Sequence, residues 1–485
     1  MKEFLLKENS YRFYLIVAIL LGVWFRFYGL DIQSLWFDEL VTTAYASYSK
    51  VINVIGHSLI VDIHPPLYHV FIYYWIKVFG NSEISYRLPS AIAGILAIFF
   101  MYFGSKKLFN NHIATSATIL IALSGSAIYY SQEARSYSLL LLFSVISTLL
   151  WLGMIKDIRQ CKIKRNELLI YGVIGIITSY LHYFGFAIIF FQLLYLFIAS
   201  LVLRNNVKRV LSLGFMIMLP FLLWFLPHFM YIKGITGGNF WIKNNWLEFF
   251  ISFLNLVFNK YIAILIFIPF LINYKSQIKG LLHNIKSLKV DSISLSLLYL
   301  SCFPLIVFLF ISLHTPILVP RYFIILLPSI YLLIAIFIST VPYFNGAKAN
   351  AYVLAISLVG VIAFLSPING NEYRFYYDLY KSDWRAASQY VVNNLDENSI
   401  IVVNKYPRTY RHYFDKLGRK DLTIKSLNDP DMRFVDIMKI CDKVLFALES
   451  EFPKGFELQL QKDCKVYSKK VFIGNLFVYE CAFNK

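Results

Sequence analysis

Four groups of charged side chains follow apolar stretches of this sequence, and they carry the chemistry that the chain can offer. In chain order they are Asp38 with Glu39, Asp62 with His64, Glu133 with Arg135, and His314 with Arg321. A carboxylate can take the proton of an attacking hydroxyl, and an arginine stays charged and donates a planar set of N–H groups to a phosphate. Charge beside an apolar wall is costly unless it faces water, pairs with an opposite charge or takes part in chemistry. The set therefore indicates a reaction in which a base activates a hydroxyl and cations hold a departing phosphate.

The composition places these groups in a membrane protein. Of the 485 residues, 58% are hydrophobic and only 15% are charged, whereas a soluble domain has about 25% charged residues. Lys and Arg number 46 against 28 Asp and Glu, which gives a net charge of +18. The basic residues are dispersed between apolar segments, as in cytoplasmic loops that fix topology, and they form no single patch for nucleic acid. We expect membrane lipids as partners and no nucleic acid.

Many of the apolar segments are long enough to cross a hydrocarbon core of roughly 30 Å. Lys2, Lys7 and Arg12 precede the first one, which predicts a cytoplasmic N-terminus and an outer loop beginning at Asp31. Arg26, near the outer end of this first span, is expected to snorkel toward the interface. We predict about eleven transmembrane helices, over residues 11–30, 87–104, 112–130, 138–155, 167–181, 183–203, 210–231, 249–273, 293–313, 322–341 and 351–365. With this topology every basic loop is cytoplasmic and every acid-bearing loop lies outside.

Two further segments are predicted as juxtamembrane helices on the outer face. Residues 42–60 mix apolar and polar residues at helical spacing, as in a helix that lies on the membrane surface. Residues 67–80 are apolar, but they number about fourteen, fewer than the ~17 that a span needs. We therefore interpret 67–80 as an interfacial or partly inserted helix, because counting it as a span would invert the loops that follow.

After residue 368 the composition changes to that of a soluble α/β domain. We expect helices at 383–395 and 410–417 and strands at 399–403, 443–447, 465–472 and 475–483, the last two joined by a turn at Ile473-Gly474. Three of the five cysteines, Cys441, Cys464 and Cys481, lie in this tail, where one disulfide is possible if the tail is outside the cytoplasm.

The expected fold class is mostly α: a polytopic membrane protein with a C-terminal soluble α/β domain. Residues 1–368 are predicted to form the transmembrane catalytic domain, in which residues 31–67 are the outer catalytic loop. Residues 369–485 are predicted to form the soluble domain, which lies on the periplasmic side by the topology above.

Five runs of residues, in this order, resemble the GT-C glycosyltransferase superfamily: Ser34–Glu39, Asp62–Tyr68, Phe79–Glu83, Arg87–Ser90 and Tyr130–Tyr137. Within the superfamily the chain is similar to the bacterial branch related to protein O-mannosyltransferases and the lipid A aminoarabinose transferase. Pro320–Tyr322 adds a weaker match, and the middle spans match only in hydrophobicity. The resemblance implies a GT-C fold in the bacterial inner membrane. It also implies inverting transfer of a sugar from a polyprenyl-phosphate carrier, such as undecaprenyl phosphate, with the active site on the periplasmic side.

The resemblance assigns roles to the acids. The general base falls on Asp38, beside Glu39, and a second catalytic acid falls on Glu133, where many relatives have Asp. The family's acid before the Pro-Pro pair has no counterpart at Ile63, and the nearest acid is Asp62, one place earlier. Two plainer readings stay open: Asp62 as the cap of a helix starting at Pro65, and an ion pair between Glu133 and its neighbour Arg135.

The resemblance also suggests where the donor phosphate binds. Arg135, Arg321 and His64 are the candidate phosphate-binding residues, although Arg321 could instead snorkel at the end of a span. His64 stands where the aminoarabinose transferase has Lys. Asp62 and His64 are the candidate ligands of a divalent metal ion. Some relatives bind a divalent ion at this corner and others need none, so the sequence leaves the cofactor open.

Together these features predict a glycosyltransferase, specifically a hexosyltransferase. It would move a sugar, expected to be a hexose, from a polyprenyl-phosphate carrier to an envelope glycan acceptor such as lipopolysaccharide O-antigen in a single displacement. Lipid A, another glycan or protein remain open as acceptors. The alternative is a transporter or flippase for a lipid-linked sugar, but such proteins usually have internal repeats and polar sites at mid-membrane. The sequence has neither feature.

Overall fold

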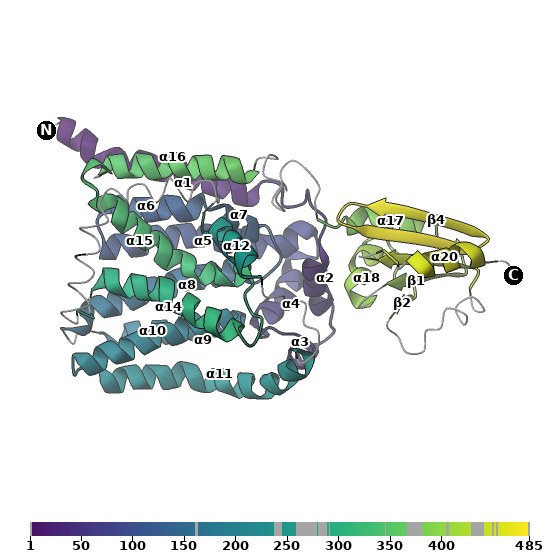
Figure 1. The fold of residues 1–485 in the computed structure, drawn as a ribbon, viewed down its shortest axis with the longest axis horizontal. Coiled ribbons are helices and arrows are strands. Elements are labelled where there is room, and N and C mark those ends of the chain that lie inside the picture. Colours follow the sequence, from purple (N-terminus) through teal and green to yellow (C-terminus); the bar gives the residue numbers. More distant parts are fainter. Residues whose placement is uncertain are drawn as a thin grey trace. The chain divides into compact units, whose positions relative to one another are not determined.

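The computed structural model describes two compact units (Figure 1). The described residues are 2–160, 163–236, 245–258, 279, 289–290, 292–344, 346–365, 381–403, 407–427, 441–448, 451–452 and 454–483. The first unit consists of residues 1–28, 51–71 and 87–366, and the second of residues 29–50, 72–86 and 367–485. The outer segments that carry Asp38 and Glu83 thus belong to the same compact unit as the tail.

The first unit is a bundle of long apolar helices that run side by side (Figure 1). A helix satisfies its own backbone polar groups, which is why apolar runs of this length fold as helices in lipid. The helices are α1 (Lys2–Phe27), α3 (Val51–Ile60), α4 (Leu67–Phe79, whose second half belongs to the other unit), α5 (Glu83–Leu108), α6 (Asn111–Ala122), α7 (Gly125–Ser131), α8 (Tyr137–Ile158), α9 (Arg165–Leu181), α10 (Tyr183–Val202), α11 (Val207–Thr236), α12 (Trp246–Val257), α14 (Ile293–Ser312), η1 (Pro320–Leu326), α15 (Leu327–Thr340), η2 (Pro342–Phe344) and α16 (Ala347–Leu365).

The predicted fold class, a mostly helical polytopic protein with a small C-terminal sheet, is confirmed. Seven helices among the described residues are long and apolar enough to cross a membrane, or eight if the bent pair α6–α7 is one span. Ten of the eleven predicted spans coincide with helices, and most of 249–273 lies outside the described residues. The total of eleven stays a prediction, since most of 249–273 is not described and neither α9, with 17 residues, nor α16 is among the seven. Helix α4, with 13 residues, is too short to span, as expected.

Residues 42–60 do not form one helix. The structure has α2 (Phe37–Ala46) and α3 with a break at residues 47–50. Ser47 ends α2: its backbone N–H donates to the carbonyl of Thr43 at 3.0 Å, and its hydroxyl donates to the carbonyl of Ala44 at 2.8 Å. A serine that bonds back to the last turn in this way competes with continuation of the helix. The prediction of a single surface helix is therefore wrong.

Gln192 joins three neighbouring helices of the bundle. Its side-chain oxygen accepts a hydrogen bond from the Tyr171 hydroxyl of α9 at 2.8 Å, and its Nε2 donates to the hydroxyl of Thr148 of α8 at 3.2 Å. Its backbone carbonyl accepts from Nε1 of Trp151 at 2.9 Å. Polar side chains between apolar helices stabilise their association when each finds a partner. These bonds hold α8, α9 and α10 together, and α8 and α10 begin at the candidate site.

Arg26 is fully buried rather than extended toward the interface. Its Nη1 donates to the carbonyls of Gly22 and Ala122, each at 2.8 Å, and its Nη2 donates to the carbonyl of Ile121 at 3.1 Å. The last carbonyls of a helix need donors, and α6 ends at Ala122, where the chain bends by 55° into α7. The prediction of snorkelling is wrong, because the guanidinium stabilises this helix break.

We expect Arg26→Met to destabilise the purified protein. The methionine keeps the volume of the side chain, but the carbonyls of Ile121 and Ala122 lose their donor, which costs roughly 1–3 kcal/mol for each buried group left unsatisfied. The measurement is the midpoint of thermal unfolding in detergent. Arg12→Met, on an exposed position of the same helix, is the control, and equal midpoints for the two variants would contradict this role.

The tail contains a five-stranded sheet with the order β2-β1-β3-β5-β4. Its elements are α17 (Trp384–Asn393), β1 (Ser399–Val403), α18 (Pro407–Lys416), β2 (Ile424–Ser426), β3 (Lys443–Leu448), α20 (Lys454–Asp463), β4 (Val466–Phe472) and β5 (Leu476–Ala482). Strand β1 pairs in parallel with β2 and β3, and β5 pairs antiparallel with β3 and β4. The β-branched run of β1 is buried, which explains why the alternation typical of exposed strands is absent.

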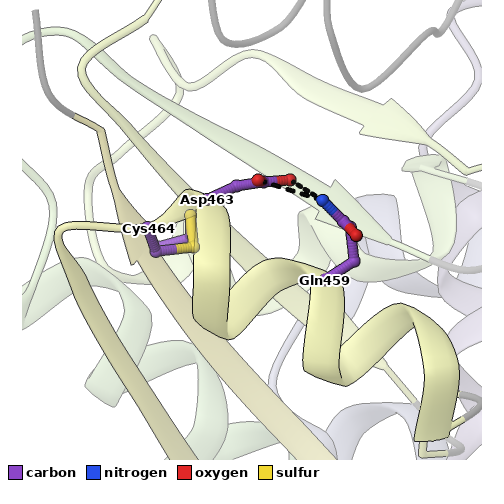
Figure 2. Close-up of a disulfide and its surroundings, with 4 residues drawn as sticks. Gln459, Asp463 and Cys464 are labelled. Carbon is purple, nitrogen blue, oxygen red and sulfur yellow. Dashed lines mark hydrogen bonds between the residues drawn. A yellow bond between two sulfur atoms is a disulfide. The ribbon is translucent and has the colours of Figure 1, made fainter.

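A disulfide and a tight turn fix the last part of the sheet. Cys464, which follows α20, is bonded to Cys481 of β5 (Figure 2). Cys441 is buried and is not part of this disulfide. The turn between β4 and β5 has left-handed backbone at Gly474 (φ 78°) and Asn475 (φ 55°). Glycine and asparagine tolerate this conformation, and two such residues in succession suit the twist of a hairpin. The predicted hairpin is therefore confirmed, with its left-handed residues one position later than expected.

Candidate active site

Asp62 lies in the turn after α3 and binds two histidines. Its Oδ1 accepts hydrogen bonds from Nδ1 of His64 at 2.8 Å and from the backbone N–H groups of Ile63 and His64 at 2.7 and 3.0 Å. Its Oδ2 accepts from Nε2 of His69 at 3.1 Å. The carboxylate therefore closes an Asx turn and is not the cap of a helix starting at Pro65, since α4 begins at Leu67.

The two histidines stabilise the ionised form of Asp62. Burial alone would raise the pKa of Asp62, but the hydrogen bonds from His64 and His69 outweigh burial and hold the pKa well below its usual range. Burial lowers the pKa of His69, with a smaller contribution from the positive charge of Arg135 and against the opposing effect of Asp62. Asp62 is thus a carboxylate that orients His64, whose Nε2 has no hydrogen-bond partner within the described residues.

The backbone of the same turn is fixed by α11. Nε2 of His228 donates to the carbonyl of Asp62 at 2.8 Å, and its Nδ1 is hydrogen-bonded to the hydroxyl of Tyr183 at the start of α10. Nε1 of Trp224 donates to the same hydroxyl at 3.3 Å. The sequence analysis missed these residues. The signal was a histidine in the apolar run of α11, because a polar group inside a span usually has a specific partner.

His182, which was also not predicted, precedes α10 and is buried. Its ring centroid lies 5.1 Å from that of His64 and 4.8 Å from that of Tyr322. Its Nδ1 accepts a hydrogen bond from the backbone N–H of Phe184 at 3.1 Å, so the proton of the neutral ring is on Nε2. Burial, followed by the positive charges of His64, Arg135 and Arg321, holds the pKa of His182 well below its usual range. His182 is therefore a neutral donor among cations.

Arg321 and Arg135 complete this group. The guanidinium carbon of Arg321, at the start of η1, lies 5.8 Å from the ring centroids of both Tyr137 and Tyr322, as in a cation–π contact. Arg135 is buried in the segment between α7 and α8. We call the two arginines Arg135 and Arg321, together with His64 and the neutral His182 beside them, the cation cluster.

Two buried donors at the cation cluster have no hydrogen-bond partner within the described part of the chain. They are Nε2 of His182 and the hydroxyl of Tyr137. The side chain of Tyr137 is 1% exposed and that of His182 3% exposed. Buried polar atoms are nearly always hydrogen-bonded in folded proteins. Both donors are therefore open to an acceptor atom from outside the described chain, such as an oxygen of an anion.

The predicted site residues divide between the two units. His64, Arg135 and Arg321 come together in the first unit, together with Asp62, and Glu133 is buried two residues before Arg135. Asp38 and Glu39 belong to the second unit, in the first turn of α2, where the helix dipole favours negative charge. His314 is exposed.

The candidate metal ligands Asp62 and His64 are hydrogen-bonded to each other. Across the described ranges, no group of three or more His, Cys, Asp or Glu side chains gathers to hold a metal ion. Both oxygens of Asp62 accept hydrogen bonds from histidines, and Nδ1 of His64 faces that carboxylate. Metal binding stays an untested prediction, and the chemistry below does not use it.

The second unit has its own cleft, with a volume of about 690 Å³. It lies between the outer segments and helices α17 and α18 of the tail, and its charged and polar lining residues include Asp31, Glu83, Asp383, Arg385, Tyr413 and Lys416. Acids and bases are mixed in this lining, so the cleft has no strong net charge.

Comparison with known proteins gives one family match and several structural ones. The model of the family described as dolichyl-phosphate-mannose-protein mannosyltransferase matches residues 63–231, which include the turn at Asp62–His64 in part and all of α8 to α10. No curated protein matches the sequence. Solved structures match this chain in their fold, at 12–13% sequence identity.

Three crystal structures illustrate that similarity. ArnT from Cupriavidus metallidurans in the apo state has a TM-score of 0.61 at 13% identity, covering 96% of this chain and 97% of ArnT. ArnT from the same organism bound to undecaprenyl phosphate has a TM-score of 0.60 at 12% identity, covering 96% of this chain and 97% of ArnT. The Archaeoglobus fulgidus oligosaccharyltransferase in complex with Zn and sulfate gives 0.50 at 13% identity, covering 95% of this chain and 73% of that one.

The chain thus has the fold of the ArnT structures, and its residues 63–231 are similar to the mannosyltransferase family. The resemblance to the GT-C superfamily, and within it to the bacterial branch that includes ArnT, is confirmed.

Proposed function

We propose that this protein is a glycosyltransferase that moves a sugar from a polyprenyl-phosphate carrier to an acceptor hydroxyl. The observation that carries the proposal is the cation cluster with its two buried donors, His182 Nε2 and the Tyr137 hydroxyl. A phosphate monoester has the negative charge and the several acceptor oxygens that such a group of donors requires. The solved ArnT complex with undecaprenyl phosphate supports a lipid phosphate as the ligand.

The chemistry is a single displacement. The carboxylate of Asp38 takes the proton of the acceptor hydroxyl while the hydroxyl oxygen bonds to the anomeric carbon. The bond from that carbon to the phosphate oxygen breaks on the opposite face, so the anomeric centre inverts and the electron pair leaves with polyprenyl phosphate. Arg135 and Arg321 stabilise the negative charge that develops on the leaving phosphate, and His64 is the third proposed phosphate-binding residue. Glu133 is the proposed second catalytic acid.

The finer specificity of this proposal rests on the sequence. We propose a hexose as the transferred sugar and an envelope glycan, such as lipopolysaccharide O-antigen, as the acceptor. The test is mass spectrometry of envelope glycans from cells with the protein, without it, and with Asp38→Asn. The expected result is a glycan species heavier by one hexose that requires both the protein and Asp38. Identical glycan profiles in all three strains would contradict the proposal.

A flippase for a lipid-linked sugar remains the alternative, and product analysis separates the two functions. A flippase moves the carrier-linked sugar intact, whereas the proposed transferase releases one polyprenyl phosphate for each sugar transferred. Liposomes that contain the purified protein, a polyprenyl-phosphate hexose and an envelope glycan acceptor should therefore accumulate free polyprenyl phosphate. Movement of intact donor without this product would favour the flippase.

We propose that the tail and the active site face the periplasm. The disulfide between Cys464 and Cys481 supports this orientation, because disulfides persist in oxidising compartments. In intact spheroplasts, a membrane-impermeant maleimide should label these two cysteines only after treatment with a membrane-impermeant reductant. Cys464→Ser/Cys481→Ser is the control for label on other cysteines. Labelling that requires lysis of the spheroplasts would place the tail in the cytoplasm.

A further inference from the structure

We infer that the tail holds the segment that carries Asp38, and that Lys381, Arg385 and Tyr413 are positioning residues for sugar transfer. This inference rests on the proposed function only for its effect on turnover. The segment from Gly29 to Trp36 forms turns and extended chain before α2 begins at Phe37. Backbone polar groups in such a segment need partners from elsewhere when they are buried. Several of these partners are residues of the tail.

Tyr413 of α18 contacts the segment at its centre. Its hydroxyl donates to Oε1 of Glu83 at 2.7 Å, which uses its only hydrogen. It therefore accepts from the backbone N–H of Leu35 at 2.7 Å and from the hydroxyl of Ser34 at 3.0 Å. Leu35 is fully buried and Tyr413 is 3% exposed. One phenol thus joins the segment before α2, the start of α5 and the tail.

Arg385 of α17 makes a parallel set of contacts. Its guanidinium forms an ion pair with Glu83, with Nε 3.2 Å from Oε1, and donates to the backbone carbonyl of Asp31 at 2.8 Å. Its backbone N–H donates to the Ser34 hydroxyl at 3.2 Å. The carboxylate of Glu83 is therefore shared by two residues of the tail, and each of them also binds the segment before α2.

Lys381 contacts the residue next to the proposed base. Its ammonium lies 3.9 Å from Oε2 of Glu39, whose side chain is fully buried and also accepts from the backbone N–H of Trp36 at 3.3 Å. The same ammonium lies 5.4 Å from the ring centroid of Trp36. A buried carboxylate without a cation tends to take up a proton. Lys381 therefore places a positive charge beside the buried carboxylate of Glu39. Glu39 in turn accepts from the backbone at the start of α2, where Asp38 lies.

These contacts give the tail a role in catalysis without any contact to the reacting atoms. A base that is misplaced by about 1 Å can lose roughly 10²-fold in rate. We call the contacts of Lys381, Arg385 and Tyr413 with the segment before α2 and with Glu39 and Glu83 the junction. Removing one hydrogen bond of this junction should lower kcat about tenfold. The KM for the lipid donor should stay unchanged, because the residues of the cation cluster belong to the other unit.

The test compares Tyr413→Phe and Lys381→Met with matched controls in full-length protein. Tyr467→Phe is the control for the tyrosine, because its hydroxyl also donates to a carboxylate, that of Glu457 within the tail, at 2.8 Å. Lys469→Met is the control for the lysine, because it pairs with Glu451 and Glu457. Lys381→Arg keeps the charge and should restore most of the activity. Thermal unfolding identifies any variant that fails to fold.

Amide hydrogen exchange tests the inference without any sugar donor or acceptor. The peptide that contains Leu35 should exchange about tenfold faster in Tyr413→Phe, while peptides of α8 and α10 keep their rates. Unchanged exchange at Leu35 overturns the inference. Faster exchange with unchanged kcat overturns the positioning role. If the unaltered protein transfers no sugar, the proposed function fails, and the exchange rates still decide whether the tail holds this segment.

Discussion

Asp38→Asn should lower the rate of sugar transfer by about 10³-fold, because a positioned general base contributes roughly 10²–10⁴-fold. Asparagine has nearly the same shape as aspartate and leaves the hydrogen bond from the Thr42 hydroxyl to the backbone carbonyl of residue 38 intact. The loss would therefore come from the missing proton acceptor. The measurement is release of polyprenyl phosphate from a polyprenyl-phosphate hexose by purified protein in liposomes with an envelope glycan acceptor.

Asp31→Asn is the matched control for this prediction. Asp31 is an exposed acid of the same segment, and its contact with Arg385 is made by the backbone carbonyl, which the substitution keeps. We expect this variant to retain nearly full turnover. Binding of undecaprenyl phosphate should be the same in both variants. Near-normal turnover of Asp38→Asn would remove Asp38 from the proposed mechanism.

Arg321→Met and Arg135→Met should each weaken binding of undecaprenyl phosphate by about 10- to 100-fold. A hydrogen bond to a charged group contributes about 1.5–3 kcal/mol, and each 1.4 kcal/mol corresponds to roughly tenfold in affinity. Methionine keeps much of the volume beside Tyr137 and Tyr322 but donates nothing to a phosphate. The measurement is equilibrium binding of undecaprenyl phosphate, followed by the intrinsic tryptophan fluorescence of the protein.

Two further variants make this prediction specific. Arg321→Lys keeps the positive charge but loses the planar fork, so its affinity should fall between that of the methionine variant and that of the unaltered protein. Arg165→Met removes an exposed arginine at the start of α9 and should leave the affinity unchanged. Equal affinities for Arg321→Met and Arg165→Met would exclude Arg321 from the phosphate site.

The sequence predicted much of the bundle because its signals are local. Apolar runs between basic residues located the helices, and the β-branched run 399–403 located β1 to the residue. Strand β2, with three residues, and helix α20, with Leu460 as its buried residue, were missed. Both are too short or too weakly apolar for their pattern to stand out from the surrounding polar residues.

The candidate site was predictable only in part, for a physical reason. The sequence named His64, Arg135 and Arg321, since charges beside apolar runs are costly and call for an explanation. His182 was not predicted, because its proximity to His64 depends on how α9 and α10 pack. Arg26 was misassigned, because a charge near the end of a span usually reaches water. The break after Ala122 instead leaves the carbonyls of Ile121 and Ala122 open to its guanidinium inside the bundle.

Because Tyr413 is synthesised long after the segment that it holds, the junction at Tyr413 makes activity depend on the order of synthesis. The amide of Leu35 leaves the ribosome early, and its hydrogen-bond acceptor follows 378 residues later. On the proposed function, a nascent or truncated chain has the proposed phosphate-binding residues Arg135 and Arg321 before the segment that carries Asp38 can settle against Tyr413. Such a chain would hold the carrier lipid without consuming it, and sugar transfer would begin only after translation has ended.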